Sequence, residues 1–166
     1  GYRAGRWNVT GTNNTWLGYG AGSGPSENSN SHNTGIGRSA LEGITTGDQN
    51  VMVGLQAGTD ITTGRYNTAV GTQSLFVDDI GDFSTAVGYN SMYSQNSDST
   101  NEVTGNTAVG GYSSYYNVEG TNNTSLGYRA GRGVSTKNHS GCVFIGPDAG
   151  LTAYTGDNNI AIGHGA

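Results

Sequence analysis

The chain has 166 residues, of which 30 are glycine, 33% are hydrophobic and 11% are charged, so it lacks the Leu, Ile and Phe of an ordinary globular core. The formal net charge of -5 at pH 7 and the scattering of the seven basic residues disfavour nucleic-acid binding, because phosphates require clustered Lys and Arg. The single cysteine, Cys142, excludes an internal disulfide, and no run approaches the ~18 apolar residues of a membrane-spanning helix or resembles a signal peptide.

One five-residue pattern returns along the whole chain and reads Asn-Thr-small-aliphatic-Gly in its commonest form. The glycine that closes each copy, called the anchor glycine below, recurs at steps of 17, 19, 17, 17, 17, 22, 17, 19 and 17 residues. The anchor glycines are Gly1, Gly18, Gly37, Gly54, Gly71, Gly88, Gly110, Gly127, Gly146 and Gly163. A period this steady predicts a solenoid of stacked coils. Because residue 1 falls within a repeat, we expect residues 1–166 to form one solenoid domain of a longer fibrous chain.

In chain order, we expect one short β-strand just before each anchor glycine. The strands are predicted within residues 14–18, 33–37, 50–54, 67–71, 84–88, 106–110, 123–127, 142–146 and 159–163. Counting the anchor as zero, position -1 is always aliphatic, position -3 is Thr, Val or Ile, and position -2 is mostly Ala, Ser or Gly. Such period-two alternation is typical of a strand. Helix is disfavoured, since each glycine costs roughly 1 kcal/mol relative to Ala.

We predict that positions -3 and -1 fill the interior of each coil, so that positions -2 and 0 form an outer face of small, uncharged residues. A strand that faces solvent normally carries charged or long polar side chains. The small-residue face therefore indicates packing against identical copies of the chain around an axis. A glycine-rich strand exposed to solvent is the alternative.

The rest of each coil is predicted to hold a tight turn, a second strand or extended segment, and another tight turn. Position +3 is always Ala or Ser, which indicates that another backbone approaches closely there. A second glycine recurs seven residues before the anchor, next to residue types that are typical of turns. Its copies are Gly11, Gly47, Gly64, Gly81, Gly120 and Gly156. Coils stacked about 4.8 Å apart would form a rod of roughly 40 to 45 Å.

The three longer steps predict loops outside the regular stack. These loops are expected at residues 23–31, 93–104 and 134–140. Insertions in repeat proteins map to surface loops, where function is often located, so these loops are candidate places for binding. Spacer turns without a function are the alternative.

Tyrosine is the most informative residue for a binding site. Tyr recurs just after several anchor glycines, which we interpret as packing along the stack. A denser group in the coil after the longest step supplies the candidate surface-binding residues Tyr112, Tyr115 and Tyr116, and Trp7 is a further candidate. Tyr offers a large contact area for little loss of conformational entropy, which suits a site for a sugar or a protein.

No grouping of residues predicts catalysis, a cofactor or a metal ion, so we do not expect an enzyme. His32, His139 and His164 occupy unrelated phases of the repeat, and we interpret them as ordinary surface residues. The acidic run 78–82 could attract Ca²⁺, which prefers oxygen ligands, but it lacks a full calcium-loop pattern. Cys142 stands where most repeats have Asn, and we expect a small, semi-buried side chain there.

The run Asn-Thr-Ala-Val-Gly-x-x-Ala/Ser resembles the head repeat of trimeric autotransporter adhesins of the YadA type, and related repeats of bacteriophage tail fibres. The resemblance covers residues 1–166. It implies an all-β fold, a left-handed parallel β-roll or β-solenoid of about nine coils, with three chains packed into a homotrimer. It also implies an extracellular, cell-surface or virion location. The coils here are longer than those of the best-known adhesin heads, which leaves the coil cross-section open.

The expected function is adhesion by a fibre segment that binds a cell-surface receptor or glycan, with three equivalent sites giving avidity. A purely structural shaft without binding of its own is one alternative. An ice-binding solenoid is another alternative, but it needs a flat array of Thr in two columns. The pairs Thr45-Thr46 and Thr62-Thr63 are replaced by Asp79-Ile80 and Val118-Glu119 in other coils. A glycan-cleaving β-helix would need clustered carboxylates in a groove, which the spacing does not indicate.

Overall fold

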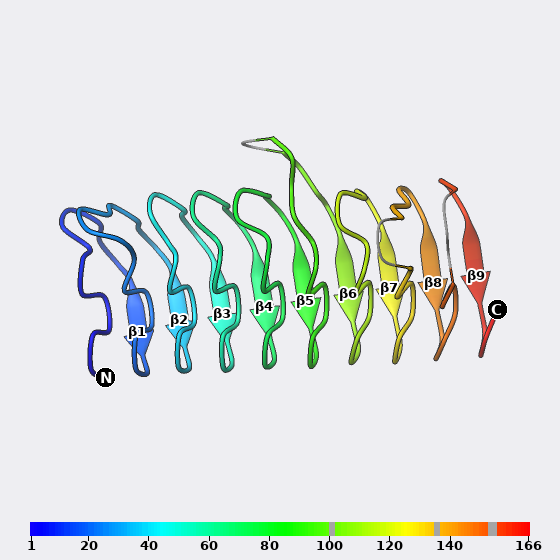
Figure 1. The fold of residues 1–166 in the computed structure, drawn as a ribbon, viewed down its shortest axis with the longest axis horizontal. Helices are drawn as coiled ribbons and strands as arrows, with labels where there is room; N and C mark the ends of the chain where they lie inside the picture. Colours follow the sequence, from blue (N-terminus) through cyan, green and yellow to red (C-terminus); the bar gives the residue numbers. More distant parts are fainter. Residues whose placement is uncertain (100–101, 135–136, 153–155) are drawn as a thin grey trace.

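The protein is a β-solenoid in which each coil contributes one three-residue strand to a single parallel sheet (Figure 1). The computed structural model describes residues 1–99, 102–134, 137–152 and 156–166. The strands are β1 (Thr15–Leu17), β2 (Thr34–Ile36), β3 (Val51–Val53), β4 (Thr68–Val70), β5 (Thr85–Val87), β6 (Thr107–Val109), β7 (Thr124–Leu126), β8 (Val143–Ile145) and β9 (Ile160–Ile162). They follow one another in chain order across the sheet. The prediction of an all-β parallel solenoid with a strand before each anchor glycine is therefore confirmed.

Equivalent positions of the repeat stack directly on one another. Thr68, for example, pairs with Thr85 across β4 and β5, and Thr85 pairs with Thr107 across β5 and β6 although that step is 22 residues long. The described residues on either side of 100–101, between β5 and β6, rise out of the stack in Figure 1. The sheet thus keeps its register through every change in coil length.

The predicted insertions are only partly outside the stack. Residues 100–101 of the segment 93–104 and residues 135–136 of the segment 134–140 lie outside the described residues. Within residues 93–104, Gln95 and Ser97 are buried, and the Ser97 hydroxyl donates to Asp78 Oδ1 at 3.1 Å. The base of this loop is therefore part of the core.

The orientation predicted for the strands is wrong. The middle residue of each strand, at position -2, points into the coil: Ala69, Ala86 and Ala108 have no exposed surface. Positions -3 and -1 point outward, and Leu17 and Ile162 are 61% and 65% exposed. The interior of the coil is narrow and is filled largely from the wall opposite the strand. Most strands therefore place a small residue in the interior, and their aliphatic residues lie outside.

Side chains at positions -2 and +4 fill the interior with complementary sizes. Where position -2 is large, position +4 is glycine: a Cβ at Gly58 would lie 2.8 Å from Met52 Sδ, and one at Gly150 would lie 2.3 Å from Phe144 Cδ1. In the coils of Ala69 and Ala86, position +4 is instead a large buried residue, Leu75 or Met92. The coils of Ala108 and Ser125 depart from this rule, because position +4 is also small there, and the Ser114 hydroxyl donates to Ser125 Oγ at 2.8 Å. In the other coils a large residue at one position accompanies a small one at the other, as dense packing requires.

A ladder of buried asparagine side chains, at position -4, links one coil to the next. Asn67 Nδ2 donates to the Gly81 carbonyl at 2.7 Å, and Asn67 Oδ1 accepts from the Ser84 backbone N–H at 2.7 Å. The ladder satisfies backbone groups that the narrow core would otherwise bury without a partner. Cys142 replaces one of these asparagines and is fully buried rather than semi-buried, with its thiol 3.4 Å from the Gly156 carbonyl.

The remainder of the coil is a series of turns. A second regular strand, which we considered, does not occur in the described ranges, where only the isolated bridges Asn8↔Asn28 and Asp82↔Val103 add to the named strands. Several non-glycine residues instead adopt a positive φ, among them Leu41 (φ 53°) and Leu75 (φ 49°). Position +3 is fully buried in most coils, which is consistent with its restriction to Ala or Ser.

Candidate functional site

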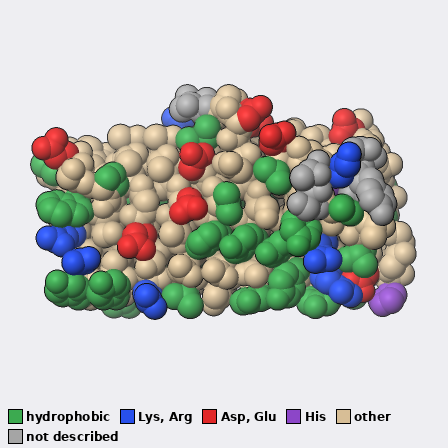
Figure 2. All heavy atoms as spheres, in the orientation of Figure 1, with side chains coloured by type: hydrophobic (Ala, Val, Ile, Leu, Met, Phe, Trp, Pro, Cys, Tyr) green, Lys and Arg blue, Asp and Glu red, His purple; other side chains and the backbone are tan. Residues whose placement is uncertain are grey.

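Aromatic and arginine side chains gather on the two turns that follow β6 and β7. Tyr112 and Arg129 occupy the same position of successive coils, and so do Tyr115 and Arg132. Tyr112, Tyr128, Arg129 and Arg132 line a hollow of about 270 Å³, called the Tyr–Arg hollow below. In Figure 2, Lys and Arg side chains adjoin hydrophobic ones toward the β8 and β9 end of the rod.

The tyrosine rings of this region pack mainly against one another. The rings of Tyr112 and Tyr128 meet edge to face, with centroids 6.2 Å apart and an interplanar angle of 85°. Tyr115 and Tyr116 meet in the same way at 4.6 Å and 82°. Such edge-to-face pairs are favourable because the positive edge of one ring meets the negative face of the other. The rings are therefore held in fixed positions around the hollow.

A second group of rings stacks along the rod and ends at Tyr115, whose ring centroid lies 5.6 Å from that of Tyr112 in the wall of the hollow. Phe76, Tyr93 and Tyr115 lie in successive coils with centroids 5.0 and 5.1 Å apart and planes within 8° of parallel. Because each ring covers the face of the next, this stack offers ring edges and hydroxyl groups to a ligand rather than open faces. Its role at the site is to hold Tyr115 in place.

The two arginines of the hollow differ in their partners. Arg129 Nε lies 2.7 Å from Asp148 Oδ1, and its guanidinium lies over the Tyr128 ring at 4.9 Å. Arg132 lies over the Tyr116 ring at 5.1 Å, and within the described part of the chain it forms no ion pair with a carboxylate. Arg132 therefore supplies positive charge that no acidic side chain in the described ranges neutralises.

Tyr112 and Tyr115 keep their hydroxyl groups protonated at neutral pH. Burial raises the pKa of Tyr112, and the neighbouring Tyr89 raises it further. Burial also raises the pKa of Tyr115, next to Tyr116. Each phenol can thus donate one hydrogen bond and accept others.

The structure brings together three of the four predicted binding residues. The ring centroids of Tyr112 and Tyr115 lie 5.6 Å apart, and the Tyr115 ring contacts that of Tyr116. Trp7 is separate, since it lies in the first coil with the Arg6 guanidinium over its ring at 4.5 Å. Sequence reasoning missed Tyr93, Tyr128, Arg129 and Arg132 as members of the site. The 17-residue step from Tyr112 to Arg129 and from Tyr115 to Arg132 was the signal that could have found the two arginines.

In the acidic run 78–82, Asp78 and Asp82 form contacts within the fold and are not arranged as a cation site. Asp82 lies against Arg65, with Oδ2 2.7 Å from Nη2 and Oδ1 accepting from the Arg65 backbone N–H at 2.7 Å. Asp78 is buried inside the coil, where its Oδ1 accepts from the Gly81 backbone N–H at 3.2 Å. Among the described residues, no three His, Cys, Asp or Glu side chains form a group that could hold a metal ion.

Replacement of Asp78 by asparagine is expected to stabilise the fold at neutral pH. Its Oδ2 is buried without a hydrogen-bond partner, and burial raises its pKa, so the folded state favours the neutral carboxyl. The stability from this preference is present below the unfolded pKa and is lost as the pH rises through the folded pKa. At pH 7, Asp78→Asn should raise the free energy of unfolding by about 1 kcal/mol in urea titrations.

The same titrations at pH 4 should show a smaller difference between Asp78→Asn and the parent chain, because the raised pKa makes the parent carboxyl neutral in a larger share of molecules than at pH 7. Asp98→Asn, at an exposed position, is the matched control and should change little at either pH. A destabilised Asp78→Asn protein at pH 7 would show that the buried carboxylate is required in its ionised form.

The histidines are not all surface residues. His139 is buried, its ring meeting Phe144 edge to face at 5.0 Å, and burial lowers its pKa. His32 lies at the surface, where its Nε2 is 3.1 Å from Asn13 Nδ2. His139 is therefore a core residue, which corrects its interpretation as a surface side chain.

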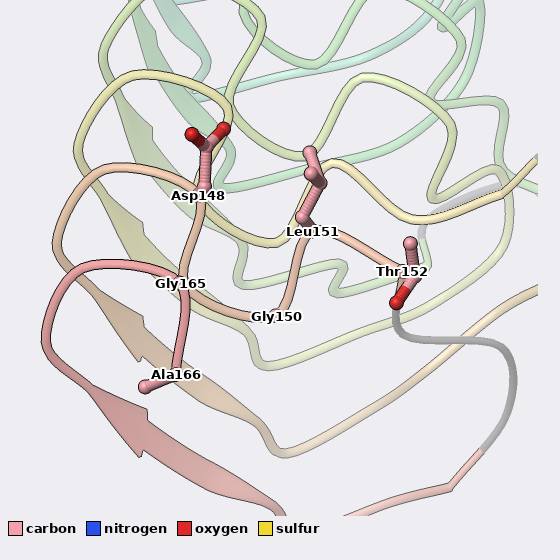
Figure 3. Close-up of a pocket in the computed structure, with 6 residues that line it drawn as sticks. All are labelled: Asp148, Gly150, Leu151, Thr152, Gly165 and Ala166. Carbon is pink, nitrogen blue, oxygen red and sulfur yellow. The ribbon is translucent and has the colours of Figure 1, made fainter.

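A second hollow, of about 300 Å³, lies between the last two coils (Figure 3). Gly150, Gly165 and Ala166 form much of its wall, and Leu151 and Thr152 complete it beside Asp148. The Asp148 carboxylate already pairs with Arg129. This hollow offers little functional chemistry beyond backbone groups.

Compared with known protein families, curated proteins and solved structures, the chain shows no significant match. Within the described ranges, no helix has the length and apolarity needed to cross a membrane. Function is therefore inferred from the surface of the solenoid itself.

Proposed function

We propose that this chain is a structural and adhesive segment of a fibre, a left-handed solenoid that assembles as a homotrimer and binds a receptor or glycan on a cell surface. The location that fits is extracellular, on a cell surface or a virion. The observation that carries the proposal is the outward face of the nine strands, called the strand face below. The Tyr–Arg hollow is the candidate binding site of each chain.

The strand face is uncharged along the whole sheet and carries an unbroken aliphatic row at position -1. Its residues at position -1 are aliphatic in every strand, and those at position -3 are Thr, Val or Ile. No charged residue stands on it, although the chain has 7 basic and 12 acidic residues. Large exposed apolar patches on soluble proteins mark interaction sites. A partner that covers this face would remove exposed aliphatic side chains such as Leu17, Leu126 and Ile162 from water.

A second copy of the chain is the partner that fits this face best. The face is a straight array of side chains repeated at each coil, so a partner must present an equally long, regular and uncharged array with aliphatic side chains to match. Another copy of the same sheet does this at every coil. Three such faces around one axis would bury all of them and leave the turns outside, where the Tyr–Arg hollow lies.

The assembly can be tested by measuring the mass of the chain in solution by sedimentation equilibrium. The parent chain should be a trimer. Val70→Glu, at a 38% exposed position in the middle of the strand face, should give monomers, because three carboxylates would meet in an apolar interface. Thr46→Glu, at an exposed turn position, is the charge-matched control and should remain trimeric. A monomeric parent chain would contradict the proposed trimer.

Binding of the fluorescently labelled chain to intact cells or immobilised glycans separates adhesion from a purely structural role. Saturable binding supports the adhesive segment. If the trimer binds none of these targets, the chain is a shaft segment, and the binding function must be abandoned. Avidity predicts that trimeric protein binds at least ~100-fold more tightly than the Val70→Glu monomer to a dense glycan surface.

A second candidate function, ice binding, is favoured by one observation. Six of the nine outward -3 positions are threonine, stacked in register on a regular parallel sheet. The turn threonines considered from the sequence do not form this column. An ice-binding protein needs the face open to water, whereas the trimer covers it. Thermal hysteresis from a monomeric parent chain would support this candidate over the trimeric fibre.

A further inference from the structure

We propose that the Tyr–Arg hollow binds an anionic pyranose, that is, a sugar ring bearing a carboxylate or sulfate group. The inference rests on the proposed adhesive function and specifies the ligand class of its site. Arg132 would hold the anionic group, and Tyr112 and Tyr128 would contact the sugar ring.

The charge of the hollow favours an anion. Asp148 neutralises Arg129 at 2.7 Å, whereas Arg132 has no carboxylate partner among the described residues. Stacking on the Tyr116 ring at 5.1 Å fixes the plane of the Arg132 guanidinium. A guanidinium held in one plane is suited to bind the two oxygens of a carboxylate or sulfate side by side.

The aromatic lining favours a sugar as the carrier of that anion. A pyranose has an apolar face of C–H groups and a rim of hydroxyl groups, so it needs both ring surface and hydrogen-bond partners. Tyr112 provides both: it meets Tyr89 and Tyr128 edge to face at 5.3 and 6.2 Å, and its hydroxyl stays protonated. Tyr128 lies beside it in the wall of the hollow.

The size and the charge of the hollow argue against larger anionic ligands. A volume of about 270 Å³ is at the lower limit for ligand pockets and suits one sugar unit. A nucleic acid would need a row of basic residues, whereas this chain has seven in total and a formal net charge of -5. The ligand is therefore a single charged residue of a glycan.

The hollow depends on the order of the coils as well as on local sequence. The hexapeptide Gly127–Arg132 also occurs as Gly1–Arg6. In that copy Tyr2 stacks face to face on Tyr19, at 5.7 Å and 25°, and Arg6 lies over Trp7. Beside Gly127–Arg132, Tyr112 stands edge-on in the preceding coil. Arg6 is therefore a matched control for Arg132, with the same local sequence and charge in another aromatic setting.

The experiment is calorimetric titration of the parent chain with 3′-sialyllactose, 3′-sulfated lactose and neutral lactose. We expect one of the two anionic sugars to bind at least ~10-fold more tightly than lactose. Preference for sialyllactose would assign the carboxylate, and preference for sulfated lactose would assign the sulfate. Added NaCl should weaken the binding, because it depends on charge.

Arg132→Ala should reduce this affinity at least ~10-fold, and Arg6→Ala should leave it unchanged. Arg132→Lys keeps the charge without the planar fork and should bind with intermediate affinity. Unchanged melting temperatures would show that each variant is folded. Equal affinity of Arg132→Ala and the parent chain, or no preference for an anionic sugar, would overturn the assignment.

Cell binding separates this inference from the proposed function. If the parent chain and Arg132→Ala bind cells equally well, the adhesive function stands and the Tyr–Arg hollow is not its site. If neither binds cells while the purified parent chain still binds an anionic sugar through Arg132, the hollow is a sugar site on a fibre with another role.

Discussion

Replacement of Gly110 by alanine is expected to unfold the solenoid or to lower its stability by at least ~3 kcal/mol, whereas alanine at the adjacent Gly111 should change it little. Gly110 has φ 135°, a conformation that residues with a side chain rarely adopt, and a Cβ there would lie 2.3 Å from the Gly127 carbonyl oxygen. At Gly111 a Cβ would meet its nearest neighbour, Tyr128 Cδ2, at 3.5 Å, which is ordinary contact.

The large effect at Gly110 has two sources. Backbone strain of this kind costs of order 1–3 kcal/mol. The Cβ would also separate the Gly110 and Gly127 turns, which weakens the Gly127 N–H to Val109 carbonyl hydrogen bond of 2.8 Å. Both losses are large beside a typical total stability of about 5–15 kcal/mol.

The measurement is thermal and urea unfolding of both variants, followed by circular dichroism at the strand signal. Gly111→Ala should unfold within a few degrees of the parent chain. Native-like stability of Gly110→Ala would show that the coils can move apart at the anchor, and close approach of neighbouring turns would then not explain why glycine recurs there.

The repeat made most of the fold predictable. A glycine that recurs at every coil at the same phase reports a close approach between neighbouring turns, and Gly71 confirms this with its Cβ direction blocked by the Gly88 carbonyl. The steady 17-residue step predicted the stacking of equivalent positions, which Thr68 and Thr85 show. The sequence left open whether the anchor needs space or a positive φ, and it needs both.

The direction in which the strands face was not predictable from their alternation alone. A period of two separates two faces but does not say which one is inside. The rule that bulky residues go inside failed at Val70 because the opposite wall of the coil, through residues such as Leu75 and Ile61, already fills the interior. Leu75 does so from φ 49°, a conformation that nothing in the sequence leads one to expect for leucine.

The part of the candidate site made by neighbours in the chain was predictable, whereas the residues that the stacking of the coils brings together were missed. Tyr115 and Tyr116 are adjacent in the chain, so their contact needed only a surface position. Arg132 reaches Tyr116 because the turn after β7 lies on the turn after β6, which follows from the coil step rather than from any motif. Trp7 is aromatic like the tyrosines of the site, but it is separated from them by six coil steps.

The complementary sizes of positions -2 and +4 predict that two damaging core substitutions will rescue each other. Ala69→Met should destabilise the fold by about 1–3 kcal/mol through overpacking against Leu75. Leu75→Gly should destabilise it by about 3–5 kcal/mol through the cavity that it leaves. The double variant reproduces the Met52 and Gly58 arrangement of the neighbouring coil, so it should unfold within about 1.5 kcal/mol of the parent chain.

A double-mutant cycle measured by urea unfolding tests this directly. The coupling between Ala69→Met and Leu75→Gly should favour the double variant by at least ~2 kcal/mol. The matched control combines Ala69→Met with Leu41→Gly, the same position two coils away, where the losses should add because the two sites share no cavity. Additive losses in the facing pair would mean that the sizes at positions -2 and +4 vary independently. Coupling confined to the facing pair would show that positions -2 and +4 of one coil share a single space in the core, which explains why the large aliphatic residue of the Ala69 strand, Val70, lies outside it.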